Sequence, residues 1–340
     1  MVTVYALIRN FEGPWPAANF EARKPDELQF ENFRIWKIRQ GIPIELECAR
    51  ELFKGAQVSY GDCVYERNYD AIPGRRDTQP DWCGFGHIPA ETEDALLLFR
   101  LYKPGDIAFV DIRIRTHKGE TFRQYPYRFT ADFHSTYPYR MESIDCARLD
   151  DFIKMIAGRE AWNSQWFKIA RRFFMYGASK EFNPSWDEAD RVVDYTTALE
   201  AALVPEHGKF IGRRLRRRAE RLLALQSSSI PQLDKLLVRL YRIRSLVSHG
   251  GIMSDEEKKM LEVESPRLEL GMREILRAAL CHLPADELRR KQVLQGFYQP
   301  SDKDYADALL VDFDSLTSGS EKQRVVEEVI TRQKHSVMTK

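Results

Sequence analysis

The residues whose types and spacing could do chemistry lie near the end of one expected helix. An apolar stripe at helical spacing predicts a helix over about Ile230–Ser248, and its members are Leu233, Leu236, Leu237, Leu240 and Val247. Arg244 follows Leu233 by eleven residues, which places the two about 20° apart on the helical wheel and predicts that Arg244 lies in the middle of the apolar face. A guanidinium keeps its charge when buried, so the pattern predicts an anionic or polar partner for Arg244.

His249 follows Arg244 by five residues and stands directly before Gly250 and Gly251, which are expected to end the helix. In an unbroken helix, residues at this spacing diverge by about 140°. The two side chains can converge if the last turn unwinds. They can also converge across a twofold interface to which each chain of a dimer contributes its own pair.

This pair suits the cleavage of RNA. The 2′-hydroxyl of RNA can attack the adjacent phosphate, an imidazole can move the proton, and a guanidinium can hold the charge that develops on the phosphoryl oxygens. None of these roles needs a metal ion. A structural alternative stays open, in which Arg244 is a buried ion-pair partner and His249 only caps the helix.

Helices are the elements that must position the pair. The hydrophobic period changes from two to 3.6 around Ser143–Asp150. Helices are expected over Leu149–Ile156, Trp166–Tyr176, a segment from Ser185 to before Pro205, Phe210–Leu225, Ile230–Ser248 and Glu269–His282. In the segment after Ser185, one face carries Ala189, Val192, Thr196, Leu199 and Leu203. Short loops between such helices predict an antiparallel bundle.

The first 145 or so residues predict mainly strands, with β-prone runs at Val2–Ile8, Phe33–Ile38 and Val58–Tyr65. The clearest element is a hairpin, in which Val110, Ile112 and Ile114 face one way and Asp111, Arg113 and Arg115 the other. Residues 117–120 supply its turn, where Gly119 can take a positive φ, and a return strand over Phe122–Phe129 is expected near a sheet edge because it contains Pro126.

The expected fold is therefore α+β. A β-rich N-terminal domain of unknown specificity covers residues 1–145, a helical domain covers residues 146–300, and a C-terminal tail over residues 301–340 holds one further helix near Glu321–Thr331.

Two segments together resemble the HEPN superfamily, specifically its Apea-like branch. One is Asp194-Tyr-Thr-Thr-Ala-Leu-Glu-Ala-Ala-Leu203 and the other is Tyr241-Arg-Ile-Arg-Ser-Leu-Val-Ser-His-Gly-Gly251. The resemblance covers about Trp166–Leu283. It implies a metal-independent endoribonuclease that is a homodimer, with Arg244 and His249 as the catalytic pair, and a role in prokaryotic antiphage defence or a toxin-like stress response.

Three further residues support this site. Family members often place Asn, Asp or His after the arginine, whereas this chain has Ser245, which keeps a hydroxyl. Glu200 resembles an acidic position of the branch and is expected to orient Arg244 or Tyr241 by a charge-assisted hydrogen bond. A solvated Glu200 is the alternative.

The helix before the pair is rich in arginine. Over Pro205–Leu225, seven Lys and Arg stand against two Glu. Leu215, Ala219 and Leu222 are expected on its core face, and Arg213, Arg214, Arg217 and Arg221 on the opposite one. This face is interpreted either as a solvated surface or as a patch that follows the RNA phosphates.

The composition bounds the remaining possibilities. The 340 residues carry a formal net charge of +1, so any affinity for nucleic acid must be local. Five widely spaced cysteines, with no signal peptide or long apolar run, favour a cytoplasmic protein without a membrane span. Cys48, Cys63, Cys83 and His87 include only one close pair, so neither a zinc site nor any cofactor is expected.

Three functions are weighed on these grounds. The leading one is a metal-independent endoribonuclease with RNA as substrate and a possible phage-derived or regulatory ligand at the N-terminal domain. The second is a non-catalytic RNA-binding or dimerisation module, which Ser245 keeps open. The third is a nucleotide-binding regulatory domain, in which Arg244 and the arginine-rich helix hold a phosphate. The nuclease requires Arg244 and His249 to open onto a shared groove.

Overall fold

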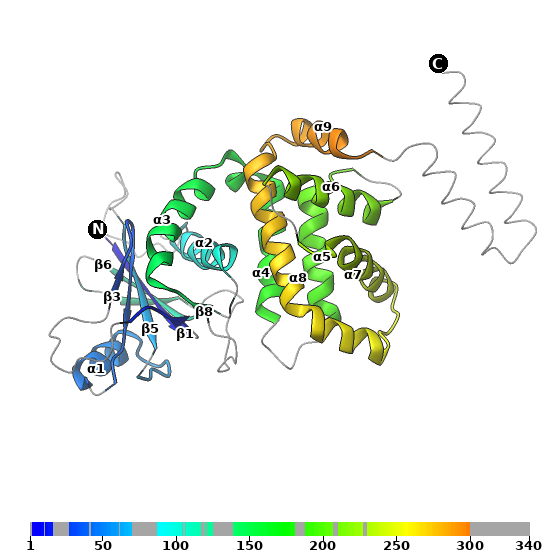
Figure 1. The fold of residues 1–340 in the computed structure, drawn as a ribbon. Coiled ribbons are helices and arrows are strands. Elements are labelled where there is room, and N and C mark those ends of the chain that lie inside the picture. The colour runs from blue at the N-terminus through cyan, green and yellow to red at the C-terminus, as the bar shows by residue number, and fades with distance from the viewer. Residues whose placement is uncertain are drawn as a thin grey trace, which may run out of the picture.

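The chain combines an antiparallel sheet with a larger helical part, so the α+β class is confirmed (Figure 1). The computed structural model describes residues 2–9, 11–15, 27–40, 42–60, 62–69, 87–103, 105, 107–116, 119, 121–124, 139–180, 188–206, 210–226 and 230–299. The expected helix near Glu321–Thr331, the end of the return strand beyond Gln124 and the expected helix start at Ser185 lie outside these residues.

The sheet of the described residues has six strands in the order β3-β4-β5-β1-β6-β7, and each pair of neighbours is antiparallel. Their bounds are Glu27–Gln29, Arg34–Lys37, Cys63–Tyr69, Val2–Arg9, Ala108–Thr116 and Thr121–Gln124 in that order. A separate parallel pair joins β2 (Phe11–Glu12) to β8 (Tyr139–Arg140). The expected hairpin is β6–β7, with β7 at the edge and a φ of +83° at Gly119.

Helices cover both faces of this sheet. The sequence predicted mainly strands in this part of the chain, so these helices were not expected. Along β1, Val4 and Ala6 face one cluster of buried side chains, whereas Leu7 faces another. Helix α1 (Pro43–Leu52) packs on the Leu7 side through Leu46 and Ala49. Helix α2 (His87–Tyr102) packs on the other side.

A bulge in β6 corrects the expected alternation. Leu7 pairs with Asp111 but Ile8 pairs with Phe109, so Val110 is the extra residue. Val110 therefore packs on the α1 side, whereas Ile112 and Ile114 face α2. Asp111 and Arg113 form a buried ion pair, with 2.7 Å between Asp111 Oδ1 and Arg113 Nε, and so do not face solvent.

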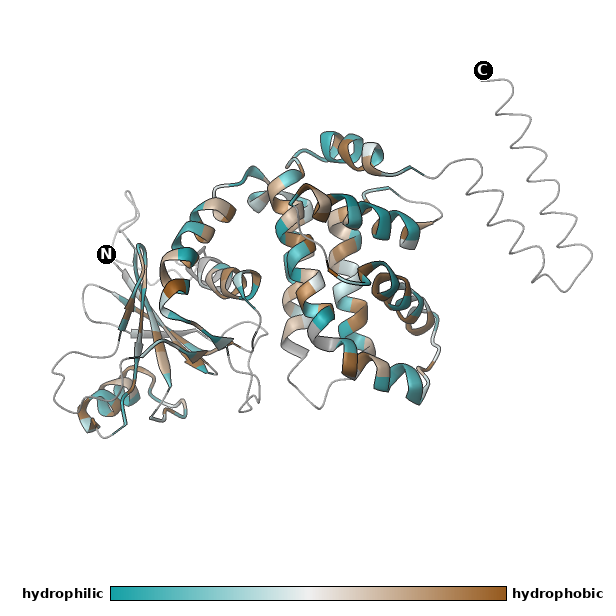
Figure 2. Cartoon of the chain, in the orientation of Figure 1, coloured by the Kyte–Doolittle hydropathy of each residue, from teal (hydrophilic) through white to brown (hydrophobic). Residues whose placement is uncertain are grey.

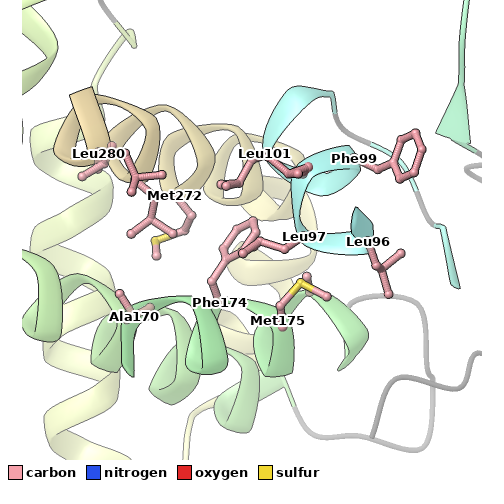
Figure 3. Packing of buried hydrophobic residues seen from close by; sticks show 14 of the residues in the cluster. Leu96, Leu97, Phe99, Leu101, Ala170, Phe174, Met175, Met272 and Leu280 are labelled. Carbon is pink, nitrogen blue, oxygen red and sulfur yellow. The ribbon is translucent and has the colours of Figure 1, made fainter. Parts of the chain in front are cut away.

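Helix α2 joins the sheet to the helical part. Figure 3 shows Leu97 and Leu101 directed toward Phe174 of α4 and toward α8, while Phe99 points away from them. Phe99 meets Phe33 and Tyr139 edge-on, with ring centroids 5.8 and 5.9 Å apart. One continuous buried core therefore runs from the sheet into the helices.

The helical part contains α3 (Ser143–Ala157), the 3-10 turn η1 (Glu160–Asn163), α4 (Gln165–Lys180), α5 (Glu188–Leu203), α6 (Ile211–Leu225), α7 (Leu233–Ser248), α8 (Asp255–His282) and α9 (Glu287–Phe297). The expected helices are present, and the expected core face of α5 is buried from Ala189 to Leu203. Helix α9 was not expected. Helix α8 begins well before Glu269, because Ser254 and Glu257 form a capping box and the helix continues through Pro266.

Among the described residues, no helix combines the length and the apolar character needed to cross a membrane.

Candidate functional site

The end of α7 is a regular helix terminus. The Gly251 N–H donates to the Leu246 carbonyl at 2.9 Å, and the Gly250 N–H donates to the Val247 carbonyl at 3.0 Å. Gly250 has a φ of +77°, so this is a Schellman motif with Gly250 in the left-handed position. A Cβ added at Gly251 would contact the Leu246 side chain and lie 3.0 Å from the Leu246 carbonyl oxygen, so this position is also crowded. The last turn does not unwind, and this route to convergence is therefore wrong.

Arg244 has the anionic partner that the apolar stripe predicts. Its Nη2 donates to Glu200 Oε2 of α5 at 3.2 Å, so the expected hydrogen bond between these residues is present. The four leucines of the stripe are buried, and the buried face also includes Ile243, directly before Arg244. Arg244 lies at the edge of the stripe, with 29% of its side chain exposed, and not in the middle as expected.

The pairing of Arg244 is incomplete when compared with that of Arg218. The Arg218 guanidinium is 1% exposed and meets Glu206 through two hydrogen bonds of 2.8 Å, one to each carboxylate oxygen. Among the described residues, Arg244 Nε and Glu200 Oε1 are buried without a hydrogen-bond partner. The Arg218 guanidinium therefore has acceptors for its N–H groups and is buried. The Arg244 guanidinium is partly exposed and does not use all of its N–H donors.

Burial shapes the electrostatics around Glu200. It raises the pKa of Glu200 above its ordinary value, and the charge and hydrogen bond of Arg244 oppose this without cancelling it. Burial also raises the pKa of Tyr241, the Glu200 carboxylate adds to the rise and Arg244 opposes it. Glu200, Arg244 and Tyr241 therefore form one electrostatic group between α5 and α7.

Tyr241 and Ser245 occupy supporting positions on α7. The Tyr241 ring packs on Gly212 of α6 so closely that a Cβ at Gly212 would lie 2.6 Å from Tyr241 Cδ1. Gly212 is thus a residue that the sequence reasoning missed, although a glycine near a helix start is a signal of close approach. Ser245 is half-buried, and its carbonyl accepts the His249 N–H at 3.2 Å.

His249 is the C-cap of α7, and its side chain is exposed. Because the helix is regular up to Ser248, the Arg244 and His249 side chains leave it in directions about 140° apart. Arg244 turns toward α5, and His249 stands at the tip of α7. Among the described residues, Arg244 is bonded to Glu200 and no hydrogen bond or ion pair joins it to His249 of the same chain.

Comparison of the chain with protein family models, with curated proteins and with solved structures finds no match.

The arginine-rich helix α6 divides into two kinds of position, which corrects the expected face. Figure 2 colours much of α6 as hydrophilic, and Arg217 and Arg221 are exposed as expected. Arg213 is half-buried beside the Phe210 ring. Arg214 is only 9% exposed, because α6 is covered by neighbouring helices on more than its leucine face. Arg214 is therefore withdrawn from the expected RNA-binding set.

Arg218 has a structural role that the sequence reasoning did not assign. Its Nη1 donates to the Leu203 carbonyl at 2.8 Å, and its Nη2 donates to the Tyr298 carbonyl at 3.1 Å. Arg290 of α9 donates to the Ala201 and Ala202 carbonyls at 2.6 and 2.8 Å. Two arginines thus satisfy the last carbonyls of α5 and fasten α9 to it.

We expect Arg218→Ala to destabilise the protein by about 3–5 kcal/mol, because it leaves the Glu206 carboxylate unpaired. Arg217→Ala, at a position 53% exposed, is the matched control and should change stability by less than about 0.5 kcal/mol. Urea unfolding measures both.

Burial raises the pKa of Glu206, but Arg218 more than offsets this and the pKa is lowered. The loss should therefore shrink in acid, as the parent's Glu206 takes up its proton. Equal effects of the two variants would contradict this role.

Of the cysteines considered for zinc, the two that the structure describes, Cys48 and Cys63, lie on opposite sides of the sheet. Cys63 is buried on the α2 side of the sheet, where burial raises the pKa of its thiol, and Cys48 is exposed on α1. Cys83 lies outside the described residues, and the side chain of His87 is likewise not described. The part of the chain that the structure describes contains no group of three or more His, Cys, Asp or Glu side chains that could hold a metal ion.

Proposed function

We propose that the chain is a HEPN-like, Apea-type endoribonuclease that cleaves RNA without a metal ion. Arg244 stabilises the charge on the phosphoryl oxygens, and His249 moves protons at the attacking or leaving oxygen. Glu200 holds one edge of the Arg244 guanidinium. Tyr241 and Ser245 complete the surroundings of Arg244 on α7.

One observation carries this proposal, namely the incomplete pairing of Arg244. Arg218, which fastens α6 to the end of α5, donates to both oxygens of Glu206 and to the Leu203 carbonyl. Arg244 makes a single 3.2 Å contact to Glu200 and is 29% exposed. This arrangement aims the guanidinium while leaving donors for a phosphate, whose planar, bidentate recognition suits arginine.

The divergence of Arg244 and His249 within one chain favours a composite site. In a homodimer whose twofold axis passes near the end of α7, Arg244 of one protomer would lie opposite His249 of its partner, and the symmetry would create this pairing twice. The exposed tip of α7 leaves His249 accessible to such a neighbour.

The exposed arginines of α6 extend the proposal to RNA binding. Arg217 and Arg221 face solvent, and Arg213 is half-buried. We assign these three to contacts with the RNA backbone, where each neutralised phosphate contributes affinity that salt weakens. The resemblance to Apea-like proteins further suggests a role in antiphage defence or stress response, with the sheet-containing part receiving a regulatory ligand.

The test is cleavage of single-stranded RNA by the purified full chain in EDTA. We expect cleavage to persist and each 5′ fragment to end in a 2′,3′-cyclic phosphate, because the attacking oxygen is internal to the RNA. Mass spectrometry of the fragments reads this product directly. If chelation stops cleavage, the mechanism is wrong. Binding of RNA without cleavage would make the chain a non-catalytic RNA-binding or dimerisation module.

A further inference from the structure

The N-terminus of α6 carries backbone N–H donors that have no acceptor within the described part of the chain. Phe210, the residue before the helix, has a φ of +64°, and its side chain does not cap the helix. The first turn holds no acidic residue, and the N–H groups of Ile211 and Gly212 have no hydrogen-bond partner among the described residues. A left-handed residue followed by helical residues directs successive N–H groups toward one point, which is a geometry that binds anions.

Arg214, in the next turn of α6, also has donors without an acceptor. The residue is 9% exposed, and its Nε and Nη1 are buried with no hydrogen-bond partner in the part of the chain that the structure describes. A buried guanidinium keeps its charge, and native proteins leave few such donors unpaired, so Arg214 calls for an acceptor from outside the chain. Arg218, one turn further on, differs because it donates to both oxygens of Glu206.

The Arg214 side chain extends toward the same end of the helix. Long helical side chains lean over the turn that precedes their own Cα, and for Arg214 this is the turn that begins at Ile211. Burial raises the pKa of Glu206, the hydrogen bonds and charge of Arg218 lower it, and the charge of Arg214 lowers it further. Glu206 precedes α6 in the chain, so this influence also places the Arg214 guanidinium near the helix N-terminus.

The charges around this point favour an anion. Both oxygens of Glu206 accept from Arg218 at 2.8 Å, so this carboxylate is already neutralised by its own cation. Arg214 adds a full positive charge, and the helix N-terminus adds about half of one. Glu220, the acidic residue within α6, pairs with Arg217 at 3.2 Å. The excess positive charge therefore lies at Arg214 and the first turn.

We propose that Arg214 and the first turn of α6 bind a phosphate group, either as inorganic phosphate or as the terminal phosphate of a small ester. The oxygens of a phosphate can accept at once from the fork of a guanidinium and from backbone N–H groups, whereas a carboxylate has only two oxygens. Because Arg214 is nearly covered, a small or terminal phosphate can reach it, unlike an RNA backbone that follows the exposed arginines. This site does not depend on RNA cleavage at Arg244.

Thermal unfolding of the full chain in phosphate and in chloride of equal ionic strength tests the site. Binding to the folded protein should raise the unfolding midpoint of the parent by about 2 °C or more at millimolar phosphate. Phosphate also stabilises folded proteins by its exclusion from their surface, and Arg214→Gln, which removes the charge, measures that part. Arg239→Gln, at an exposed position of α7, is the matched control and should respond to phosphate as the parent does.

The same variant separates an anion site from a structural cation. Without phosphate the parent holds a buried charge that has no partner, so Arg214→Gln should unfold at the midpoint of the parent or above it in chloride. A structural cation would give a lower midpoint on its removal.

Calorimetric titration of the parent with inorganic phosphate, ribose 5-phosphate and acetate identifies the ligand. We expect inorganic phosphate or ribose 5-phosphate to bind at least about tenfold more tightly than acetate. Tighter binding of the ester would show that the site takes a terminal phosphate, and tighter binding of inorganic phosphate would show that it takes the free ion.

Three results would overturn the proposal. One is an equal rise of the unfolding midpoint in phosphate for the parent and for Arg214→Gln. Another is a lower midpoint of Arg214→Gln in chloride, or a variant that does not fold, which would make Arg214 a structural cation. The third is that neither phosphate compound binds the parent more tightly than acetate. The comparison of the three anions needs no variant.

Discussion

His249→Ala is expected to lower the rate of RNA cleavage by about 10²–10⁴-fold, the usual contribution of a general acid or base. The side chain is exposed and the helix end is fixed by backbone hydrogen bonds, so the fold should be unaffected. The free energy of unfolding should therefore change by less than about 0.5 kcal/mol. Single-turnover cleavage and urea unfolding measure the two effects separately.

The chain offers a matched control in His282, which is also exposed and stands in the last turn of α8. His282→Ala should leave the rate of cleavage unchanged. A His249→Ala variant that cuts as fast as the parent would remove His249 from the mechanism. An equal loss in both histidine variants would point to a general effect of surface charge.

Arg244→Ala is expected to lose both cleavage and stability, unlike the histidine variant. Removal of the guanidinium leaves the half-buried Glu200 carboxylate without its cation, at a cost of about 1–3 kcal/mol. Arg244→Lys should also fail in cleavage, because an ammonium group cannot reproduce bidentate phosphate contact. Arg242→Ala, at an 80% exposed position of the same helix, is the control for both measurements.

The stability loss of Arg244→Ala should depend on pH. The pKa of Glu200 is already raised by burial, and the loss of Arg244 removes the influence that opposes this. When the folded-state pKa of a carboxyl group exceeds the unfolded value, the folded protein binds more protons in the window between them, and stability falls as pH rises through that window. The variant should therefore lose less stability at about pH 5 than at about pH 8. A pH-independent loss would contradict the role of Glu200.

The helical part was largely predictable because its signals are local. The leucines of α7 repeat at the helical period, and Gly250 and Gly251 end the helix as expected. The same pattern predicted a polar partner for Arg244, and the resemblance pointed to Glu200. The angle between Arg244 and His249 also followed from the spacing once the last turn proved regular.

Other features depend on contacts between distant segments. Helix α2 is apolar on two sides because it packs on both the sheet and the helical part, so its sequence around Leu96–Phe99 shows no clear period. The bulge at Val110 depends on pairing with β1. A helical wheel gives the direction of Arg214 and Arg218 but does not reveal that neighbouring elements, including the end of α5 and the Tyr298 carbonyl, cover them.

Mixed dimers test the composite site most directly. Co-expression of differently tagged Arg244→Ala and His249→Ala chains allows the mixed dimer to be purified by two affinity steps. If each site takes Arg244 from one chain and His249 from its partner, one of the two sites stays intact in the mixed dimer. Cleavage should then return to about half of the parent rate, although each variant alone is nearly inactive. A mixed dimer as inactive as its two parents, or a chain that stays monomeric at micromolar concentration, would contradict the account.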